Sequence, residues 1–223
     1  MNLLTKLIFY FKRPKIIIVS GKNRFLAIGA VLQVLEHHFK IQAVERISLK
    51  NILDNEILVL EIFTKEDLTF LIKKSKKPIL INTYVGEIPQ DTFSFSGTEQ
   101  EIDFERKLAR ILPDFGSLIL NFDDEAVRNI REETSGSVIT FGFQKMADLT
   151  VTDLNISENT FNFKIDYQEK IIPVWLENIF EKETVYAVLA SICAGIELGV
   201  NLVEISQILK DFKDISAQKR LSY

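Results

Sequence analysis

Up to Phe143 the chain alternates between short apolar runs and longer segments whose apolar positions recur every three or four residues. The continuous apolar runs are typical of strands buried on both faces. They predict strands at Lys15–Ser20, Ile57–Glu61, Pro78–Asn82, Ser117–Asn121 and Ser137–Phe141. Helical spacing predicts helices between them at Arg24–His38, Lys65–Lys74, Glu99–Leu112 and Glu125–Glu133. This repetition predicts an α/β fold, a doubly wound parallel sheet with helices on both faces.

After Phe143 the pattern changes to short strands joined by tight turns. The predicted strands are Leu149–Ile156, Thr160–Asp166 and Lys170–Val174, with turns at Glu158-Asn159 and Gln168-Glu169. They indicate a small antiparallel three-stranded sheet appended to the parallel one. Helices are then predicted at Lys182–Leu198 and Leu202–Phe212, with Gly199 placed between them as a C-cap.

Residues 1–13 carry the apolar run LLTKLIFYF, which is too short to span a bilayer and is interrupted by Lys6. We expect an amphipathic lead-in helix that packs against a single domain formed by residues 14–223. Association with a membrane surface is the open alternative for this segment. We expect no transmembrane segment and, since no small-residue cleavage site follows, a cytoplasmic location.

Composition narrows the classes of partner. The chain has 223 residues, a net charge of −4 and 47% hydrophobic residues, as in an ordinary globular protein. A mildly acidic chain is a poor match for nucleic acid, which selects a basic face. Cys193 is the single cysteine, so an internal disulfide is excluded.

The most informative stretch begins at the first predicted strand, which runs through Ser20-Gly21 directly into a helix. This is the layout of a phosphate-binding loop, where helix-N-terminal amides and a lysine hold phosphates. Where G-K-[ST] would stand, however, this chain has Arg24-Phe25-Leu26. The strand–loop–helix layout of a nucleotide site is present, but the lysine and the hydroxyl residue that usually bind phosphate and magnesium are not at their usual positions.

Several motifs resemble the central ATP-binding domain of the Mur ligases, the ATP-dependent amino-acid ligases of peptidoglycan synthesis. The segment Leu118–Phe143, with LNFDDEAV and VITFGF, is similar to the family's "vLNaDDp.v…vitfG", and Glu181–Leu209 resembles its late helical segment. Three shorter motifs follow the family's order along the chain: VLE (Val59–Glu61), IN (Ile81-Asn82) and LPDFG (Leu112–Gly116). The closest resemblance is to the type that adds D-alanyl-D-alanine. It implies a P-loop-NTPase-like fold, and a chain without the family's N-terminal substrate domain and C-terminal ligase domain.

The resemblance lays the family's phosphate loop, T-G-T-N-G-K-T-T, over residues 20–27. Ser20, Gly21 and Asn23 keep its character, whereas the phosphate-binding lysine falls on Phe25 and the magnesium-binding hydroxyl on Leu26. An apolar ring and an isobutyl group cannot replace an ammonium and a hydroxyl.

Two questions about this loop stay open. Lys22 or Arg24 could supply positive charge from a displaced backbone position. The loop itself could bind an anion through its amides, or be an ordinary strand-to-helix turn.

The resemblance also identifies candidate metal ligands. The family's magnesium-binding glutamate falls on Glu61, its carbamylated lysine on Glu105 and a histidine near Glu87. Together these acids could form a carboxylate magnesium site, or they could be solvated acids. The nucleotide-contacting residues of the late helix fall on Glu183, Thr184 and Ala187.

Asn121, Asp123 and Asp124 match the family turn that lies beside the adenine. The same three residues could simply cap a helix, because a side-chain oxygen accepts hydrogen bonds from free amides there. With Ser20, Gly21, Lys22 and Asn23 they form the candidate cofactor-binding set, a vestigial nucleotide site.

Three functions are compatible with these residues. The changed groups favour a catalytically inactive protein that acts by interaction or as a scaffold in a cell-wall-related context, with a protein partner or a second copy and no cofactor. The alternative is an ATP- and magnesium-binding module of an acid–amino-acid ligase that works with partner chains. A third is a surface-associated protein that uses Leu3–Phe11.

Overall fold

One sheet runs through the whole of the computed structural model, which describes residues 1–60, 65–84, 99–157, 160–177 and 182–212. Its strand order is β2-β3-β1-β4-β5-β6-β7-β8-β9. The strands are β1 (Lys15–Ser20), β2 (Ile41–Val44), β3 (Ile57–Leu60), β4 (Pro78–Asn82), β5 (Ser117–Asn121), β6 (Ser137–Gly142), β7 (Leu149–Ser157), β8 (Thr160–Tyr167) and β9 (Lys170–Glu177).

Strands β1 to β6 pair in parallel, as the alternation of strands and helices predicts. The final three strands form the predicted antiparallel meander. The meander is continuous with the main sheet because β7 pairs in parallel with β6 through Phe141↔Leu149 and Gly142↔Thr150. The predicted α/β architecture is therefore confirmed, with one mixed sheet in place of a parallel sheet and a separate small one.

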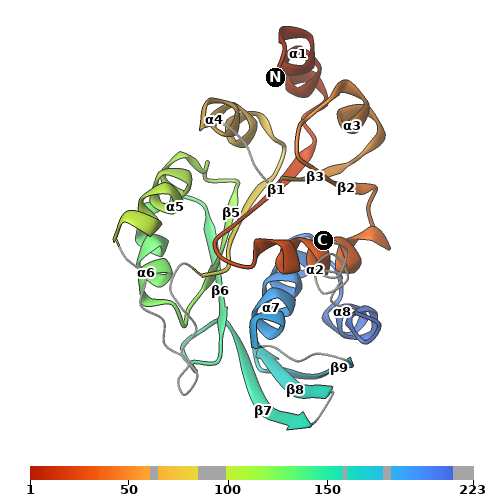
Figure 1. Cartoon of the computed structure of the whole chain (residues 1–223), viewed down its shortest axis with the longest axis vertical. Helices are drawn as coiled ribbons and strands as arrows, with labels where there is room; N and C mark the ends of the chain where they lie inside the picture. The colour runs from red at the N-terminus through yellow and green to blue at the C-terminus, as the bar shows by residue number, and fades with distance from the viewer. Residues whose placement is uncertain (61–64, 85–98, 158–159, 178–181, 213–223) are drawn as a thin grey trace, which may run out of the picture.

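Helices cover both faces of this sheet (Figure 1). Helices α2, α7 and α8 lie on one face, and the other helices lie on the opposite face. The helices are α1 (Leu3–Lys12), α2 (Arg24–Glu36), α3 (Leu49–Asp54), α4 (Lys65–Lys74), α5 (Glu99–Ile111), α6 (Glu125–Arg128), the 3₁₀ helix η1 (Asn129–Glu133), α7 (Lys182–Glu197) and α8 (Leu202–Leu209).

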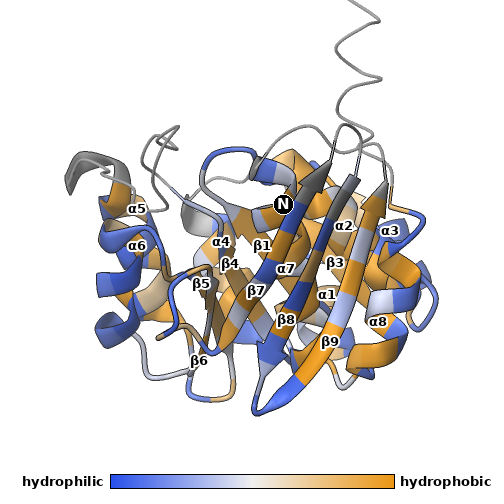
Figure 2. Ribbon diagram, turned by 90° about the horizontal axis from the view of Figure 1, so that it is seen from below, coloured by the Kyte–Doolittle hydropathy of each residue, from blue (hydrophilic) through white to orange (hydrophobic). Residues whose placement is uncertain are grey.

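The two faces of β1 explain its continuous apolar run. Ile17 and Val19 belong to the core under α2 and α7, whereas Ile16 and Ile18 belong to the core under α1, α4 and α5. Successive side chains of a strand point to opposite faces, so a strand covered on both sides has no polar positions. Figure 2 shows the resulting concentration of hydrophobic residues in the central strands.

The elements differ from the prediction mainly at their ends. Helix α2 ends at Glu36 rather than His38, and the sequence pattern did not predict β2 or α3. Gly199 ends α7 as expected, with φ +81°, while the Val200 amide donates to the Gly195 carbonyl at 2.9 Å. The turn at Gln168-Glu169 is present, whereas the one at Glu158-Asn159 lies outside the described residues.

Among the described helices, none has the length and apolar character needed to cross a bilayer.

Candidate functional site

The carboxyl ends of three adjacent parallel strands place the candidate residues along one edge of the sheet. Ser20 ends β1, Asn82 ends β4 and Asn121 ends β5, and Ser20 is in register with Asn82. In parallel α/β sheets ligands bind at this edge, outside the carboxyl ends of the strands. The site is therefore where the fold predicts a nucleotide site.

The loop after β1 is packed onto the residues that follow β4. The Lys22 amide donates to the Tyr84 carbonyl at 2.8 Å, and the Thr83 hydroxyl lies 2.6 Å from the Lys22 carbonyl. Gly21 has φ +91°, and a Cβ there would lie 2.5 Å from the Thr83 Oγ1 atom. The Asn23 amide group donates to the Tyr84 hydroxyl at 2.6 Å. These contacts close the loop, and they engage a backbone amide that a phosphate loop would turn to its ligand.

The first turn of α2 holds Phe25 and Leu26, the two positions at which the resemblance expects a lysine and a hydroxyl. Leu26 is buried in the core beneath α2 and α7, whereas the Phe25 ring is 54% exposed. The Arg24 guanidinium lies 4.7 Å from the centroid of the Phe25 ring, a cation–π geometry. The Arg24 charge is therefore on the solvent side of the helix start, and the hydroxyl position is occupied by a core side chain.

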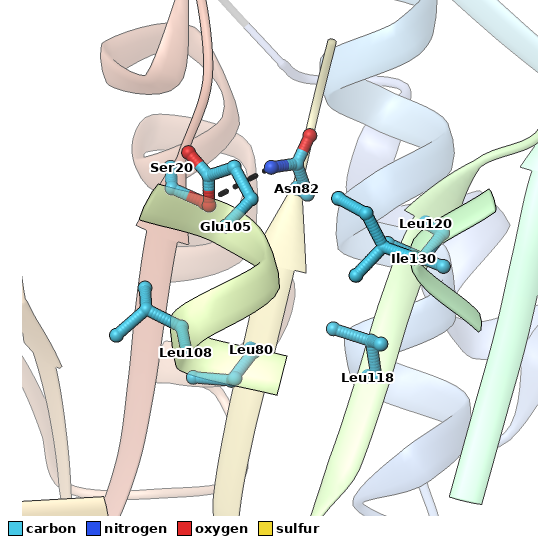
Figure 3. Close-up of a pocket in the computed structure, with 8 residues that line it drawn as sticks. All are labelled: Ser20, Leu80, Asn82, Glu105, Leu108, Leu118, Leu120 and Ile130. Carbon is cyan, nitrogen blue, oxygen red and sulfur yellow. Dashed lines mark hydrogen bonds between the residues drawn. The ribbon is translucent and has the colours of Figure 1, made fainter. Parts of the chain in front are cut away.

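Glu105 from α5 reaches the start of the same loop (Figure 3). Its Oε2 atom accepts a hydrogen bond from the Ser20 hydroxyl at 2.7 Å, and the Asn82 amide lies 3.4 Å from the Ser20 Oγ atom. Glu105 is only 8% exposed. Burial raises the pKa of its carboxyl, and the hydrogen bonds from Ser20 and Asn82 offset part of that rise.

These three side chains line a small cavity of about 10 Å³, closed below by leucines of β4, β5 and α5. The buried Asn82 Oδ1 atom has no hydrogen-bond partner among the described residues. A volume of this size accommodates about one water molecule. Among the described residues, Ser20, Asn82 and Glu105 therefore line a small polar cavity at this edge of the sheet.

The buried carboxyl predicts a pH-dependent effect of Glu105→Gln. Because the native pKa is raised, the native state holds its proton at a pH where the unfolded state has lost it, so stability falls as pH rises above the ordinary value of 4.5. Each unit between the two pKa values is worth about 1.4 kcal/mol. We expect the variant to be more stable than the parent at pH 7. The difference in stability between the two proteins should disappear below pH 4.5, as measured by melts followed by circular dichroism.

Glutamine keeps an oxygen that can accept from the Ser20 hydroxyl and removes the ionisable group. The exposed Glu132→Gln is the matched control, for which we expect no such difference. A Glu105→Gln protein less stable than the parent across this pH range would contradict the assignment of a costly buried charge.

Asp123 joins β5 to the end of β6. Its carboxylate accepts from the Phe143 amide at 2.8 Å, the Gln144 amide at 3.0 Å and the Tyr186 hydroxyl at 2.9 Å. It is 1% exposed; burial raises the pKa of its carboxyl, and these donors lower it in part. These three hydrogen bonds tie the turn after β5 to the end of β6 and to α7.

Asp124 and Asn121 make hydrogen bonds within the turn that follows β5. Asp124 caps α6 by accepting from the Ala126 and Val127 amides, and Asn121 accepts from the Asp123 amide at 3.0 Å. Among these three residues, the contacts therefore give the helix-cap role to Asp124.

The structure brings together some of the candidate residues and separates others. Ser20, Asn82 and Glu105 meet at one point, while the Asp123 carboxylate is used inside the fold. Glu61 and Glu87 lie outside the described residues. In the late helix Thr184 and Ala187 are buried.

Sequence reasoning missed Thr83, Tyr84 and Tyr186, which hold the loop and the β5 turn. Thr83 and Tyr84 directly follow a predicted buried strand, so the sequence could have predicted that they lie at the edge of the sheet where ligands bind. Their contact with the loop could not have been predicted, because it depends on β4 lying beside β1.

Sequence comparison relates the chain to a group of bacterial ligases. It is 31% identical over 123 residues to the UDP-N-acetylmuramate–L-alanine ligase of Persephonella marina, a match over 55% of this chain and 25% of that enzyme. The corresponding ligase of Alkaliphilus metalliredigens is 32% identical over 111 residues, 49% of this chain and 24% of that enzyme. No family model matches the sequence.

Structure comparison gives the same group. The D-alanyl-D-alanyl ligase of Acinetobacter baumannii superposes with a TM-score of 0.73 at 17% identity, over 95% of this chain and 50% of that structure. The MurF ligase of Thermotoga maritima, solved in complex with ADP, gives a TM-score of 0.70 at 17% identity, over 94% of this chain and 51% of that one. The chain therefore spans about half of these structures, and the sequence matches cover about a quarter of the curated relatives.

Proposed function

Because the homologues of this chain are Mur ligases and its fold is that of their central domain, we propose that it is a non-catalytic relative of that domain. In this proposal it acts as an interaction or scaffold protein in a cell-wall-related context, through a protein partner or a second copy. The observation that carries the proposal is the closed loop after β1, with the Glu105 carboxyl hydrogen-bonded at its start.

A nucleotide triphosphate does not fit the groups present. Transfer of a phosphoryl group depends almost entirely on positioned positive charge and on amides directed at the phosphates. Here the Lys22 amide is bonded to the Tyr84 carbonyl, the position aligned with the family's lysine holds Phe25, and the Ser20 hydroxyl donates to the buried Glu105 carboxyl. We therefore derive no catalytic step through ATP.

One observation favours the alternative of an ATP- and magnesium-binding module. Ser20, Asn82 and Glu105 bring three oxygen-bearing side chains to one cavity, and oxygen donors are what magnesium prefers. A bound magnesium ion would neutralise phosphate charge there. The described residues, however, include no group of three acidic, histidine or cysteine side chains that could hold a metal. This alternative needs a second carboxylate, for which Glu61 is the candidate.

Titration of the protein with ATP and magnesium decides between the two. On the proposed function we expect no heat of binding by calorimetry and no rise in melting temperature at millimolar ATP. Magnesium alone should also leave the melting temperature unchanged. Micromolar affinity for ATP, or stabilisation by ATP that depends on magnesium, would overturn the proposal in favour of the alternative.

A double variant, Phe25→Lys with Leu26→Thr, tests whether only two groups are missing. We expect it to remain without ATP binding, because the loop contacts to Thr83 and Tyr84 are unchanged. Burying a threonine hydroxyl in place of Leu26 should cost about 1–3 kcal/mol. Phe25→Lys alone, at an exposed position, is the control for stability. Tight ATP binding by the double variant would mean that the pocket is otherwise intact.

A further inference from the structure

Helix α1 presents an apolar surface to solvent. Leu3 is 85% and Phe11 75% exposed, and Leu4, Leu7 and Tyr10 are about half exposed. At about 100° per residue these five positions fall within roughly a third of the helix circumference. Thr5 and Phe9 point the other way and are buried. The apolar arc of α1 (Leu3, Leu4, Leu7, Tyr10 and Phe11) thus faces away from the domain.

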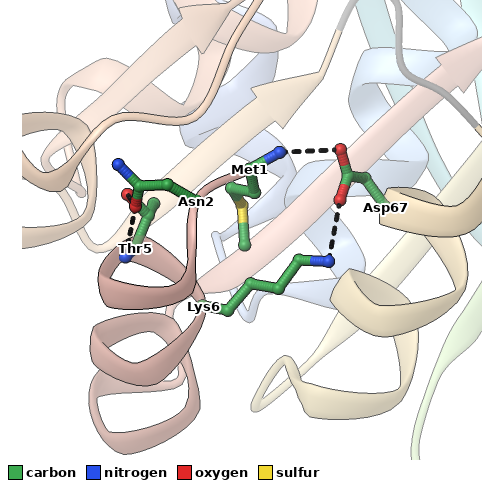
Figure 4. Close-up of polar contacts among 5 residues, drawn as sticks. All are labelled: Met1, Asn2, Thr5, Lys6 and Asp67. Carbon is green, nitrogen blue, oxygen red and sulfur yellow. Dashed lines mark hydrogen bonds and ion pairs between the residues drawn. The ribbon is translucent and has the colours of Figure 1, made fainter.

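The opposite side of α1 holds the helix in place. The Phe9 ring packs against Phe70 of α4 with centroids 5.9 Å apart. Asp67 of α4 binds the Met1 amino group at 3.1 Å and the Lys6 ammonium at 3.5 Å (Figure 4). Asn2 caps the helix by accepting from the Thr5 amide at 2.8 Å. The outward direction of the arc is therefore set by specific contacts.

Cations surround one end of the arc. The Lys74 ammonium lies 5.3 Å from the centroid of the Tyr10 ring, and Arg13 Nε donates to the Lys74 carbonyl at 3.3 Å. A hollow of about 390 Å³ adjoins them. Its charged lining residues are Lys12, Arg13, Lys15, Lys40, Lys76, Asp54 and Glu56. Cations outnumber acids here although the whole chain carries a net charge of −4, so the positive charge is a local feature.

We propose that the apolar arc of α1 and these adjoining cations form a docking surface for an anionic lipid bilayer. Helix α1 would lie parallel to the membrane surface, with the arc among the acyl chains and the cations against the headgroups. A helix that is apolar on one side and flanked by Lys and Arg is typical of interfacial binding. Helix α1 contains no acidic residue, and at 10 residues it is too short to span a bilayer.

The charge of the surface favours an anionic lipid bilayer over a second copy of the chain. A second copy would bring the same cations against its own, since a two-fold interface joins identical patches. An anionic bilayer attracts these cations and accepts apolar side chains without a preformed pocket. This inference does not depend on the state of the loop after β1.

Vesicle cosedimentation tests the proposal with the full chain. We expect binding to vesicles of phosphatidylglycerol and phosphatidylcholine, little binding to phosphatidylcholine alone, and weaker binding in high salt. Leu7→Glu with Phe11→Glu, and separately Lys12→Glu with Lys74→Glu, should each reduce the apparent affinity by tenfold or more. These positions are exposed, so melts by circular dichroism should match the parent.

Met146→Glu and Ile171→Glu are matched controls, because both residues are exposed and apolar but lie away from α1. We expect both to bind vesicles as the parent does. Absence of binding to anionic vesicles would overturn the proposal, as would equal loss in the controls. A dimer by light scattering that Leu7→Glu dissolves, without vesicle binding, would assign the surface to a second copy instead.

Discussion

Replacing Asp123 by alanine is expected to lower the free energy of unfolding by about 3–5 kcal/mol, because it removes a buried carboxylate that accepts three hydrogen bonds. The donors are the Phe143 and Gln144 amides and the Tyr186 hydroxyl. Denaturant unfolding followed by circular dichroism measures the change. The effect should appear in stability and leave nucleotide binding as it is in the parent.

Two milder variants calibrate this result. Tyr186→Phe removes one of the donors together with its bond and should cost about 1–2 kcal/mol. Asp124→Ala removes the cap of α6 and should cost about 0.5–2 kcal/mol. An Asp123→Ala protein within about 1 kcal/mol of the parent would be too stable for the loss of three hydrogen bonds to a buried carboxylate, and would contradict the inference that these bonds hold β5 to β6 and α7.

Gly21→Ala is expected to destabilise the protein by about 2–4 kcal/mol, through a left-handed backbone conformation and a steric clash together. The backbone has φ +91° at this position, and the new Cβ would lie 2.5 Å from Thr83 Oγ1 and 2.6 Å from the Tyr84 carbonyl oxygen. Thermal and denaturant melts measure the loss. The experiment tests the contact of Gly21 with Thr83 and Tyr84.

Gly29→Ala is the matched control. It lies inside α2, where a Cβ would meet nothing within 4 Å. The same chemical change should therefore stabilise the protein by about 0.5–1 kcal/mol, because alanine is the better helix former. If Gly21→Ala and Gly29→Ala shift the melting temperature alike, the loop does not lie against Thr83 and Tyr84.

Much of the secondary structure could be predicted because strands buried on both faces leave an unmistakable pattern. The starts of β1, β4, β5 and β6 agree with the prediction, and so do those of the three strands of the meander. Strand β2 was missed because IQAV is short and only its last residue is buried. Helix α3 was missed because it is a single short segment with one buried residue, Ile52, so its sequence has no helical period to detect.

The candidate site was predicted less completely. The positions of Ser20 and Gly21 at the end of a strand follow from local pattern, and the contact between Ser20 and Glu105 does not. The two residues are 85 positions apart and meet because α5 packs over β1 and β4 at the carboxyl edge. Asp123 matched a nucleotide-binding turn by sequence, whereas its contacts show that its carboxylate joins β5 to β6 and α7.

By itself, the sequence determined the alternation of strands and helices and the apolar character of Phe25 and Leu26 at the start of the first long helix. Local periodicity and residue identity suffice for both, because neither depends on distant parts of the chain. Only the tertiary structure decided that Thr83 and Tyr84 close the loop and that the apolar arc of α1 faces solvent. Those outcomes depend on which strand lies beside β1 and on which side of α1 packs against α4, and such long-range packing leaves no local pattern.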